Sequence, residues 1–287
     1  MSVTKKYLRT AVPRGLRNWL RAPLRSIEWA WDEVKYAAGA KEIIAMRPGF
    51  SPVCHPAVFN FAYKLQLIDR DQVEEFDGFI KYASQRMVLF DIGAHFGLFS
   101  LAALHYGGPQ AVALAIDPSP TAARMVKIQA QLNQVSDRLQ VLQASVGDHT
   151  GMQSMVAVGV MAGGYFVPPQ GDHTETELTV TKAVTIDDLA HRYQIKPTHI
   201  KIDVEGDEAA VLKGGQQTLS LAEAPLLFVE LHNLIVSELG RDPGEPISQL
   251  DEYGYKIFSS DGTPISAKAM LEKEIIRVIA RKGDRLG

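Results

Sequence analysis

The sequence predicts an α/β fold in which helices cover both faces of a mostly parallel sheet of seven strands. From residue 87 onward, short apolar runs alternate with helical patterns, as in successive βαβ units. The first of these runs ends in Asp91 and is followed by a turn that contains Gly93 and Gly97. Later runs end at Asp117 and near Asp203, and the carboxyl ends of parallel strands meet at one edge of a sheet.

The N-terminal part differs in character from the rest. Residues 1–27 carry seven cations and no acid, which favours a solvated basic arm over a segment that contacts a membrane surface or an acidic partner. Residues 26–47 read as helical with an interruption at Gly39. Asp71–Tyr82 is a clear amphipathic helix, with Asp71 as its expected cap and Glu74 in a capping-box position.

The alternating region begins after that helix. Helices are expected near 97–106, 119–133, 209–213 and 246–253, and a further helix is expected to begin with residues 186–189. Strands are expected at 87–91, 111–116, 139–144, 200–204, 225–231, 255–259 and 274–281. Residues 151–182 break this rhythm with two strand-like runs around a stretch rich in glycine and proline. We interpret them as a hairpin-like insertion, either a lid on the acceptor side or a plain surface excursion. The sequence thus divides into an extension, 1–54, and one domain, 55–287.

The turn after the first strand carries the strongest chemical signal. Its spacing is D-x-G-x-x-x-G, from Asp91 to Gly97, whereas dinucleotide folds use G-x-G-x-x-G. A carboxylate beside the turn would repel a pyrophosphate but suits a ligand with a cationic centre, such as S-adenosyl-L-methionine. The pattern therefore favours this cofactor over a nicotinamide, and an ordinary βα turn that binds nothing is the plain alternative.

A second acid supports a nucleoside ligand. Asp117 ends the second strand, some twenty residues beyond the glycine turn. A carboxylate in this place can accept hydrogen bonds from both ribose hydroxyls. The alternative is an Asp that starts a turn before Pro118.

Composition excludes several classes of protein. A net charge of −3 gives no general attraction to nucleic acid, and the lone Cys54 cannot form an internal disulfide. No apolar run has the length of a membrane span, and the basic N-terminus lacks the apolar core of a secretory signal. These features predict a cytoplasmic protein.

The chain resembles the FkbM-type methyltransferases, a branch of the class I S-adenosylmethionine-dependent enzymes with a Rossmann-like sheet. The resemblance covers about residues 55–281, and Lys201–Gly206 (KIDVEG) is its most specific part. The other matching segments are FDIGAHFGLFS at 90–100, IDP at 116–118, TIDDL at 185–189, VLKG at 211–214 and VELH at 229–232. The family commonly has Asn at the position of His95 and Glu at the position of Asp117.

The resemblance implies a set of residues that bind the cofactor. They are Asp91, Gly93, Ala94, Gly97 and Asp117, with His95 in the same turn and Ser145 placed near the adenine. The shorter Asp117 still offers a ribose acceptor, and His95 is expected to alter the contacts to the methionine end of the cofactor.

Three further residues are candidates for catalysis. We favour His232 as the general base because an imidazole titrates near neutrality, with Asp203 and Glu205 as rivals or as groups that orient the substrate. A second reading leaves His232 as a strand-end residue that only supports its neighbours. We expect no metal, since histidine suits Mg²⁺ poorly and no zinc-type spacing is present.

These observations predict a methyltransferase that methylates a hydroxyl of a small-molecule or glycan acceptor, a sugar or a secondary metabolite. The alternative is a catalytically inactive methyltransferase fold that acts as a binding module through a partner. Neither the acceptor nor the oligomeric state follows from the residues.

Overall fold

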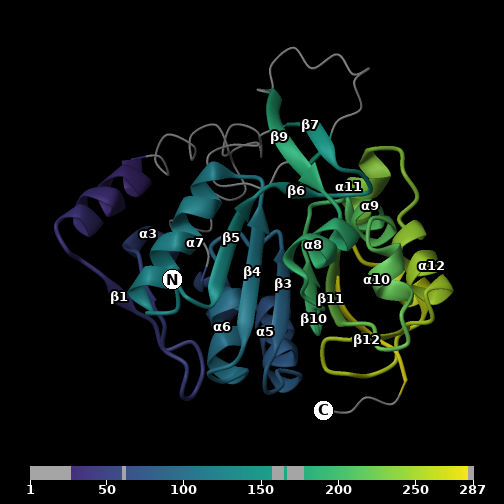
Figure 1. The fold of residues 1–287 in the computed structure, drawn as a ribbon, viewed down its shortest axis with the longest axis horizontal. Helices are drawn as coiled ribbons and strands as arrows, with labels where there is room; N and C mark the ends of the chain where they lie inside the picture. The colour runs from purple at the N-terminus through teal and green to yellow at the C-terminus, as the bar shows by residue number, and fades with distance from the viewer. Residues whose placement is uncertain (1–26, 60–62, 157–164, 167–177, 284–287) are drawn as a thin grey trace, which may run out of the picture.

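The computed structural model describes residues 27–59, 63–156, 165–166 and 178–283. The basic arm and most of the tip of the predicted insertion lie outside these residues. The centre of the molecule is a seven-stranded sheet with the order β12-β13-β11-β10-β3-β4-β5, drawn in Figure 1. The strands from β11 to β5 are parallel, and β13 is antiparallel to both of its neighbours. The predicted mostly parallel seven-stranded sheet is therefore confirmed.

The strands lie close to their predicted ranges. They are β3 (Val88–Ile92), β4 (Val112–Asp117), β5 (Leu139–Gln143), β10 (His199–Ile202), β11 (Leu226–Leu231), β12 (Lys256–Ser259) and β13 (Ile276–Arg281). Helix α6 (Leu98–Tyr106) follows β3, and α7 (Pro120–Leu132) follows β4. Ser119 caps α7 through a hydrogen bond from the backbone N–H of Ala122, with Pro120 at the first helical position.

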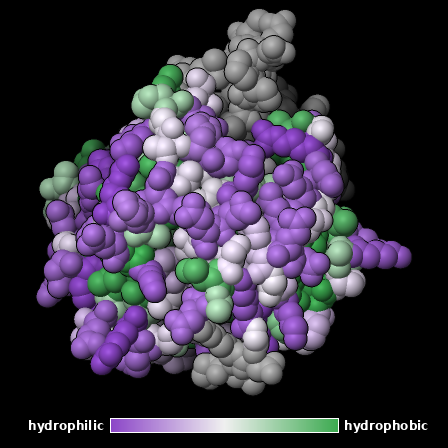
Figure 2. All heavy atoms as spheres, turned by 45° about the vertical axis from the view of Figure 1, so that its right-hand side comes forward, coloured by the Kyte–Doolittle hydropathy of each residue, from purple (hydrophilic) through white to green (hydrophobic). Residues whose placement is uncertain are grey.

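The two faces of the sheet have separate cores. Adjacent residues of one strand point to opposite faces, so Leu89 lies in one buried cluster and Phe90 in the other. The first cluster packs under α5 (Arg70–Lys81), α6 and α7. The second packs under α8 (Ile186–Tyr193), α9 (Glu208–Lys213), α10 (Gln216–Ser220) and α12 (Glu245–Glu252). Figure 2 shows the side with the second set of helices as mostly hydrophilic, with only separate hydrophobic patches.

Two predictions about the N-terminal region are wrong in detail. The helix spans 27–37, and the chain then forms β1 (Glu42–Ile43), which pairs with β2 (Val53–Cys54), so residues 40–47 are not helical. Helix α5 is capped by Asp69, which accepts a hydrogen bond from the Gln72 N–H at 3.2 Å, and not by Asp71. Asp71 lies within the first helical turn, where its charge favours the positive end of the helix dipole.

The insertion is more than a hairpin. Its strands β7 (Gly151–Val156) and β9 (Leu178–Val184) pair antiparallel, as the hairpin-like interpretation requires. In addition, β8 (Tyr165–Phe166) pairs with β7, and β6 (Ser145–Val146) pairs with β9 in parallel, which gives a second sheet of four strands above the first (Figure 1). Ser145 therefore belongs to a strand that sequence periodicity does not reveal. The division into an extension and one domain stays a prediction.

The remaining elements are short. They are α3 (Pro56–Val58), α4 (Leu65–Ile68), α11 (Asn233–Glu238) and α13 (Ala267–Leu271). In the part of the chain that the structure describes, no helix combines the length and the apolar character needed to cross a membrane.

Candidate active site

The turn after β3 brings the backbone close to the neighbouring strand end. Gly93 has φ of 75°, and a Cβ on it would lie 1.8 Å from the backbone oxygen of Asp203. Only glycine tolerates both the left-handed conformation and this approach. Gly97 also has positive φ and stands at the N-cap of α6. The sequence motif therefore holds the predicted cofactor turn directly against the end of β10.

Asp91 is buried in this turn. One of its carboxylate oxygens accepts a hydrogen bond from the Ser100 hydroxyl at 2.6 Å, and the other, Oδ1, has no hydrogen-bond partner among the described residues. Burial raises the pKa of Asp91, and the positive charge of Lys201 works against that rise. A buried carboxylate oxygen that is left unpaired suits a ligand that brings a hydrogen-bond donor or a cation.

Asp117 faces the same turn from the end of β4. Its carboxylate accepts hydrogen bonds from the backbone N–H of His95 at 2.9 Å and of Ser119 at 2.8 Å. Burial raises its pKa to about 7 despite these two bonds. Each oxygen keeps a lone pair for another donor, so the side chain fits the predicted role of ribose acceptor. That role stays a prediction.

His95 adopts the left-handed conformation, with φ of 48°, and its ring stacks on Phe96 at 3.8 Å between centroids. Its Nε2 is buried without a partner among the described residues, and burial lowers its pKa to about 4. The ring is therefore neutral at physiological pH. Ser145 is buried, and its hydroxyl donates to the carbonyl of Lys182 at 3.2 Å. The predicted contact of Ser145 with adenine stays untested.

The three candidate catalytic residues meet at the ends of β10 and β11. His232 Nε2 lies 3.5 Å from Glu205 Oε2 and 3.9 Å from Asp203 Oδ1. The imidazole is 3% exposed, whereas the side chains of Asp203 and Glu205 are 29% and 41% exposed. The sequence thus predicted a set of residues that the fold does bring together, next to the cofactor turn.

Sequence reasoning missed the charged residues that support this cluster. His232 Nδ1 is 2.7 Å from the buried Glu208, which also accepts a hydrogen bond from the Gly206 N–H. Lys201 Nζ donates to Asp203 Oδ2 at 3.0 Å. Lys201 is buried, and its Nζ lies over the Phe99 ring, 4.7 Å from the ring centroid.

The same network continues across the sheet. Arg277 on β13 donates to Glu75 at 3.0 Å and to Glu230 at 2.5 Å, and Glu230 Oε1 is 3.7 Å from His232 Nε2. The signal that could have revealed these residues is a charged residue inside an otherwise apolar strand, as with Lys201 in β10 and Glu230 in β11, because a buried charge needs a partner.

The electrostatic setting changes the argument for His232. Burial would lower its pKa, but the hydrogen bond to Glu208 and the charges of Asp203 and Glu205 outweigh it and raise the pKa to about 9. The ligand-free imidazole is therefore charged at neutral pH. The expectation that it titrates near neutrality is wrong in this structure, while its part in catalysis remains a prediction.

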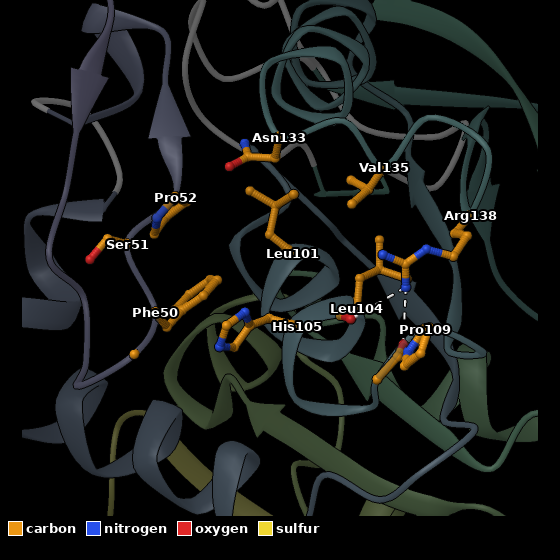
Figure 3. A pocket seen from close by; sticks show the side chains of 12 residues that line it. Phe50, Ser51, Pro52, Leu101, Leu104, His105, Pro109, Asn133, Val135 and Arg138 are labelled. Atoms are coloured by element: carbon orange, nitrogen blue, oxygen red, sulfur yellow. Dashed lines mark hydrogen bonds between the residues drawn. The ribbon is translucent and has the colours of Figure 1, made fainter.

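A groove at the amino ends of the central strands is separate from the cluster of Asp203, Glu205 and His232. It has a volume of about 560 Å³ and is lined by residues such as Phe50, Leu104, His105 and Arg138. Arg138 donates hydrogen bonds to the backbone carbonyls of Leu104 and Gly108, and Figure 3 shows its guanidinium group turned toward Leu104 and Pro109. Leu104 and His105 lie at the end of α6, and Arg138 directly precedes β5, so the groove lies at the amino ends of the strands.

Three features define the class of protein as a Rossmann-like methyltransferase. They are the order of the strands, the glycine turn against β10 and the acids at the ends of β3 and β4. The family model described as the methyltransferase FkbM domain matches residues 91–257, more than half of the chain. The chain therefore belongs to the FkbM methyltransferase family. Its cofactor is S-adenosylmethionine, and the unpaired Asp91 Oδ1 and the acceptor Asp117 fit that cofactor.

Solved structures of other methyltransferases match the chain with low sequence identity. Precorrin-6y C5,15-methyltransferase from Geobacter metallireducens is 14% identical, with a TM-score of 0.43, over 76% of this chain and 91% of that one. An O-methyltransferase from Bacillus cereus in complex with SAH is 9% identical, with a TM-score of 0.39, over 74% and 80%. No curated protein sequence matches the chain. Because these TM-scores are below 0.5, the residue assignments come from the chain's own geometry.

Proposed function

We propose that this S-adenosylmethionine-dependent methyltransferase methylates a hydroxyl group of a small-molecule or glycan acceptor. The observation that carries the proposal is the position of the Asp203, Glu205 and His232 cluster directly beside the cofactor turn, where a Cβ on Gly93 would meet the Asp203 backbone. A hydroxyl must lose its proton as it is methylated, and polar groups able to hold and accept that proton lie in this cluster.

When bound, the cofactor supplies an electrophilic methyl group on a sulfonium whose sulfur keeps the bonding electron pair. The chain's own task is to hold the acceptor oxygen in line with that methyl and to take its proton. Glu205 is the most exposed member of the cluster, so it is the group best placed to meet the acceptor. Asp203 is tied to Lys201 and is suited to orienting the acceptor.

The test is transfer of a labelled methyl group from S-adenosylmethionine into a panel of sugars, phenols and polyketide alcohols, with matched amines and thiols. Labelled ethers are the expected products, and Glu205→Gln is expected to reduce their formation. Transfer to amines alone would contradict the proposal. Cofactor binding by calorimetry without transfer to any acceptor would favour the inactive binding module instead.

A further inference from the structure

The imidazole of His232 directs Nε2 toward three carboxyl groups. Among the described residues, Nε2 makes no hydrogen bond, and Glu230 Oε1 at 3.7 Å already accepts from Arg277. The other two acceptors, Glu205 Oε2 and Asp203 Oδ1, lie 3.5 and 3.9 Å from Nε2. One ligand atom from each of Asp203, Glu205 and His232 can be chosen so that all lie within 4.8 Å of one another. A metal ion that takes the place of the imidazole proton would join Nε2 to Asp203 and Glu205.

The spacing suits a small divalent ion. Bonds of about 2.0–2.2 Å to nitrogen and oxygen place tetrahedral ligand atoms about 3.3–3.6 Å apart. The shorter of the two observed distances lies in that range, and the longer one needs a shift of a few tenths of an ångström. Because Asp203 and Glu205 follow β10 and are partly exposed, such a shift requires no movement of the sheet.

A neighbouring carboxylate holds the His232 ring in the way that imidazoles that bind metal ions are usually held. Glu208 is buried and lies 2.7 Å from Nδ1. This contact fixes the ring and leaves Nε2 as the nitrogen whose electron pair can bind a metal ion. Carboxylate–histidine pairs of this kind orient the imidazoles that bind metals. Asp203 is held in a similar way, since Oδ2 accepts from Lys201 while Oδ1 faces His232.

The charges around the cluster also leave room for an ion. The ion pairs link five carboxyl groups to the cations Lys201 and Arg277 and to the imidazole of His232, which is the third positive group. The five carboxyl groups are those of Glu75, Asp203, Glu205, Glu208 and Glu230. The carboxyl groups outnumber the positive groups, and exchange of the imidazole proton for a dication would add one positive charge that offsets part of this excess.

We propose that Asp203, Glu205 and His232 form a binding site for one divalent first-row transition-metal ion. The imidazole nitrogen disfavours Mg²⁺ and Ca²⁺, which prefer oxygen ligands, and the two carboxylates suit Mn²⁺ or Zn²⁺. Three protein ligands leave coordination positions open for oxygen atoms of an acceptor. The ion's role toward that acceptor rests on the proposed function, but its binding to the protein does not.

The experiment is a titration of the full chain, freed of metal by a chelator and without cofactor, with MnCl₂. Bound Mn²⁺ is measured by the loss of its sharp electron paramagnetic resonance signal. One ion per chain is expected, held more tightly than Mg²⁺ in competition. Glu205→Gln and His232→Asn are each expected to weaken Mn²⁺ by at least about tenfold, and Glu208→Gln by about 10- to 100-fold through its effect on His232.

The matched control is the double variant Asp148→Asn/His149→Gln. It removes another histidine and carboxylate in contact, at 3.0 Å on the exposed surface, and is expected to leave Mn²⁺ binding unchanged. Glu205 is partly exposed, so its variant remains informative if His232→Asn does not fold. Circular dichroism establishes which variants are folded.

Two results would overturn the site: no Mn²⁺ bound by the folded chain, or binding that Glu205→Gln and folded His232→Asn leave unchanged. Mg²⁺ bound as tightly as Mn²⁺ would overturn the imidazole as a ligand. Methyl transfer to a hydroxyl without Mn²⁺ binding would remove the metal and keep the proposed function. Mn²⁺ binding without methyl transfer to a hydroxyl would keep the metal site and remove the proposed function.

Discussion

A buried histidine lies at each end of the central strands, one at their amino ends (the amino edge) and one at their carboxyl ends (the carboxyl edge). The pKa values of the two histidines are shifted in opposite directions. His199 begins β10 at the amino edge, where the Thr198 hydroxyl lies 2.7 Å from Nδ1 and the carbonyl of Tyr82 lies 3.0 Å from Nε2. His232 follows β11 at the carboxyl edge among carboxylates. Burial lowers the pKa of His199 to about 4, whereas the pKa of His232 is raised to about 9. Neighbouring charge, and not burial alone, therefore decides the state of a histidine in this protein.

The comparison separates stability from function. The amino edge offers its histidine only neutral partners, which suits a structural part. The carboxyl edge gathers several acids and cations beside the cofactor turn, which suits catalysis. Substitutions at the amino edge should lower the free energy of unfolding and spare turnover, whereas substitutions of charged residues at the carboxyl edge should lower turnover more than stability.

The largest effect is expected for His232→Asn. It removes the nitrogen that faces Asp203 and Glu205 and should lower kcat by about 10²- to 10⁴-fold, with little change in the dissociation constant of S-adenosylmethionine. Steady-state kinetics and calorimetry measure the two quantities. His199→Asn is the control at the other edge, and equal losses of kcat in both variants would break the comparison.

Gly93→Ala should affect both stability and function. Its Cβ would lie 1.8 Å from the Asp203 backbone oxygen, so the turn or β10 must move, at a cost of about 3 kcal/mol or more in the free energy of unfolding. Urea denaturation measures this cost. The matched control is Gly39→Ala, which has φ of 91° but no atom within 4 Å of the new Cβ, so it should cost only about 1 kcal/mol.

Asp117→Ala should weaken S-adenosylmethionine binding by about 10- to 100-fold, because a charged acceptor of hydrogen bonds is lost. In the unsubstituted protein, the pKa of about 7 means that affinity should fall as pH drops below 7, where the carboxylate takes up a proton. Calorimetry from pH 6 to 8.5 measures both effects. An affinity of the Ala variant equal to that of the parent would remove the ribose assignment.

The smallest effect concerns the stability of the amino edge in acid. His199 has a pKa of about 4 in the folded chain against an ordinary value of 6.5, so between these values the unfolded chain binds the extra proton. Its contribution is full above pH 6.5 and is lost as pH falls toward 4. Thermal unfolding of His199→Asn should therefore show a shallower loss of stability in this window, and the same slope as the parent protein would contradict the inference.

Much of the fold follows from local patterns. The apolar runs predict each strand of the large sheet to within a residue or two, because a strand buried on both faces leaves a continuous signal. The N-terminal strands β1 and β2 were missed because two residues carry no periodicity. Their stability comes from packing of residues such as Ile44 and Cys54 in the core.

The candidate site divides in a similar way. The chain by itself determined which polar residues stand at the strand ends, since Asp91, Asp203 and His232 each follow an apolar run, and strand ends of a parallel sheet share one edge. Only the tertiary structure decided their electrostatics. The pKa of His232 depends on Glu208, 24 residues away along the chain, and the charge balance depends on Glu75 and Arg277, 202 residues apart. Coulomb interactions act through space, so residue spacing along the chain does not reveal them.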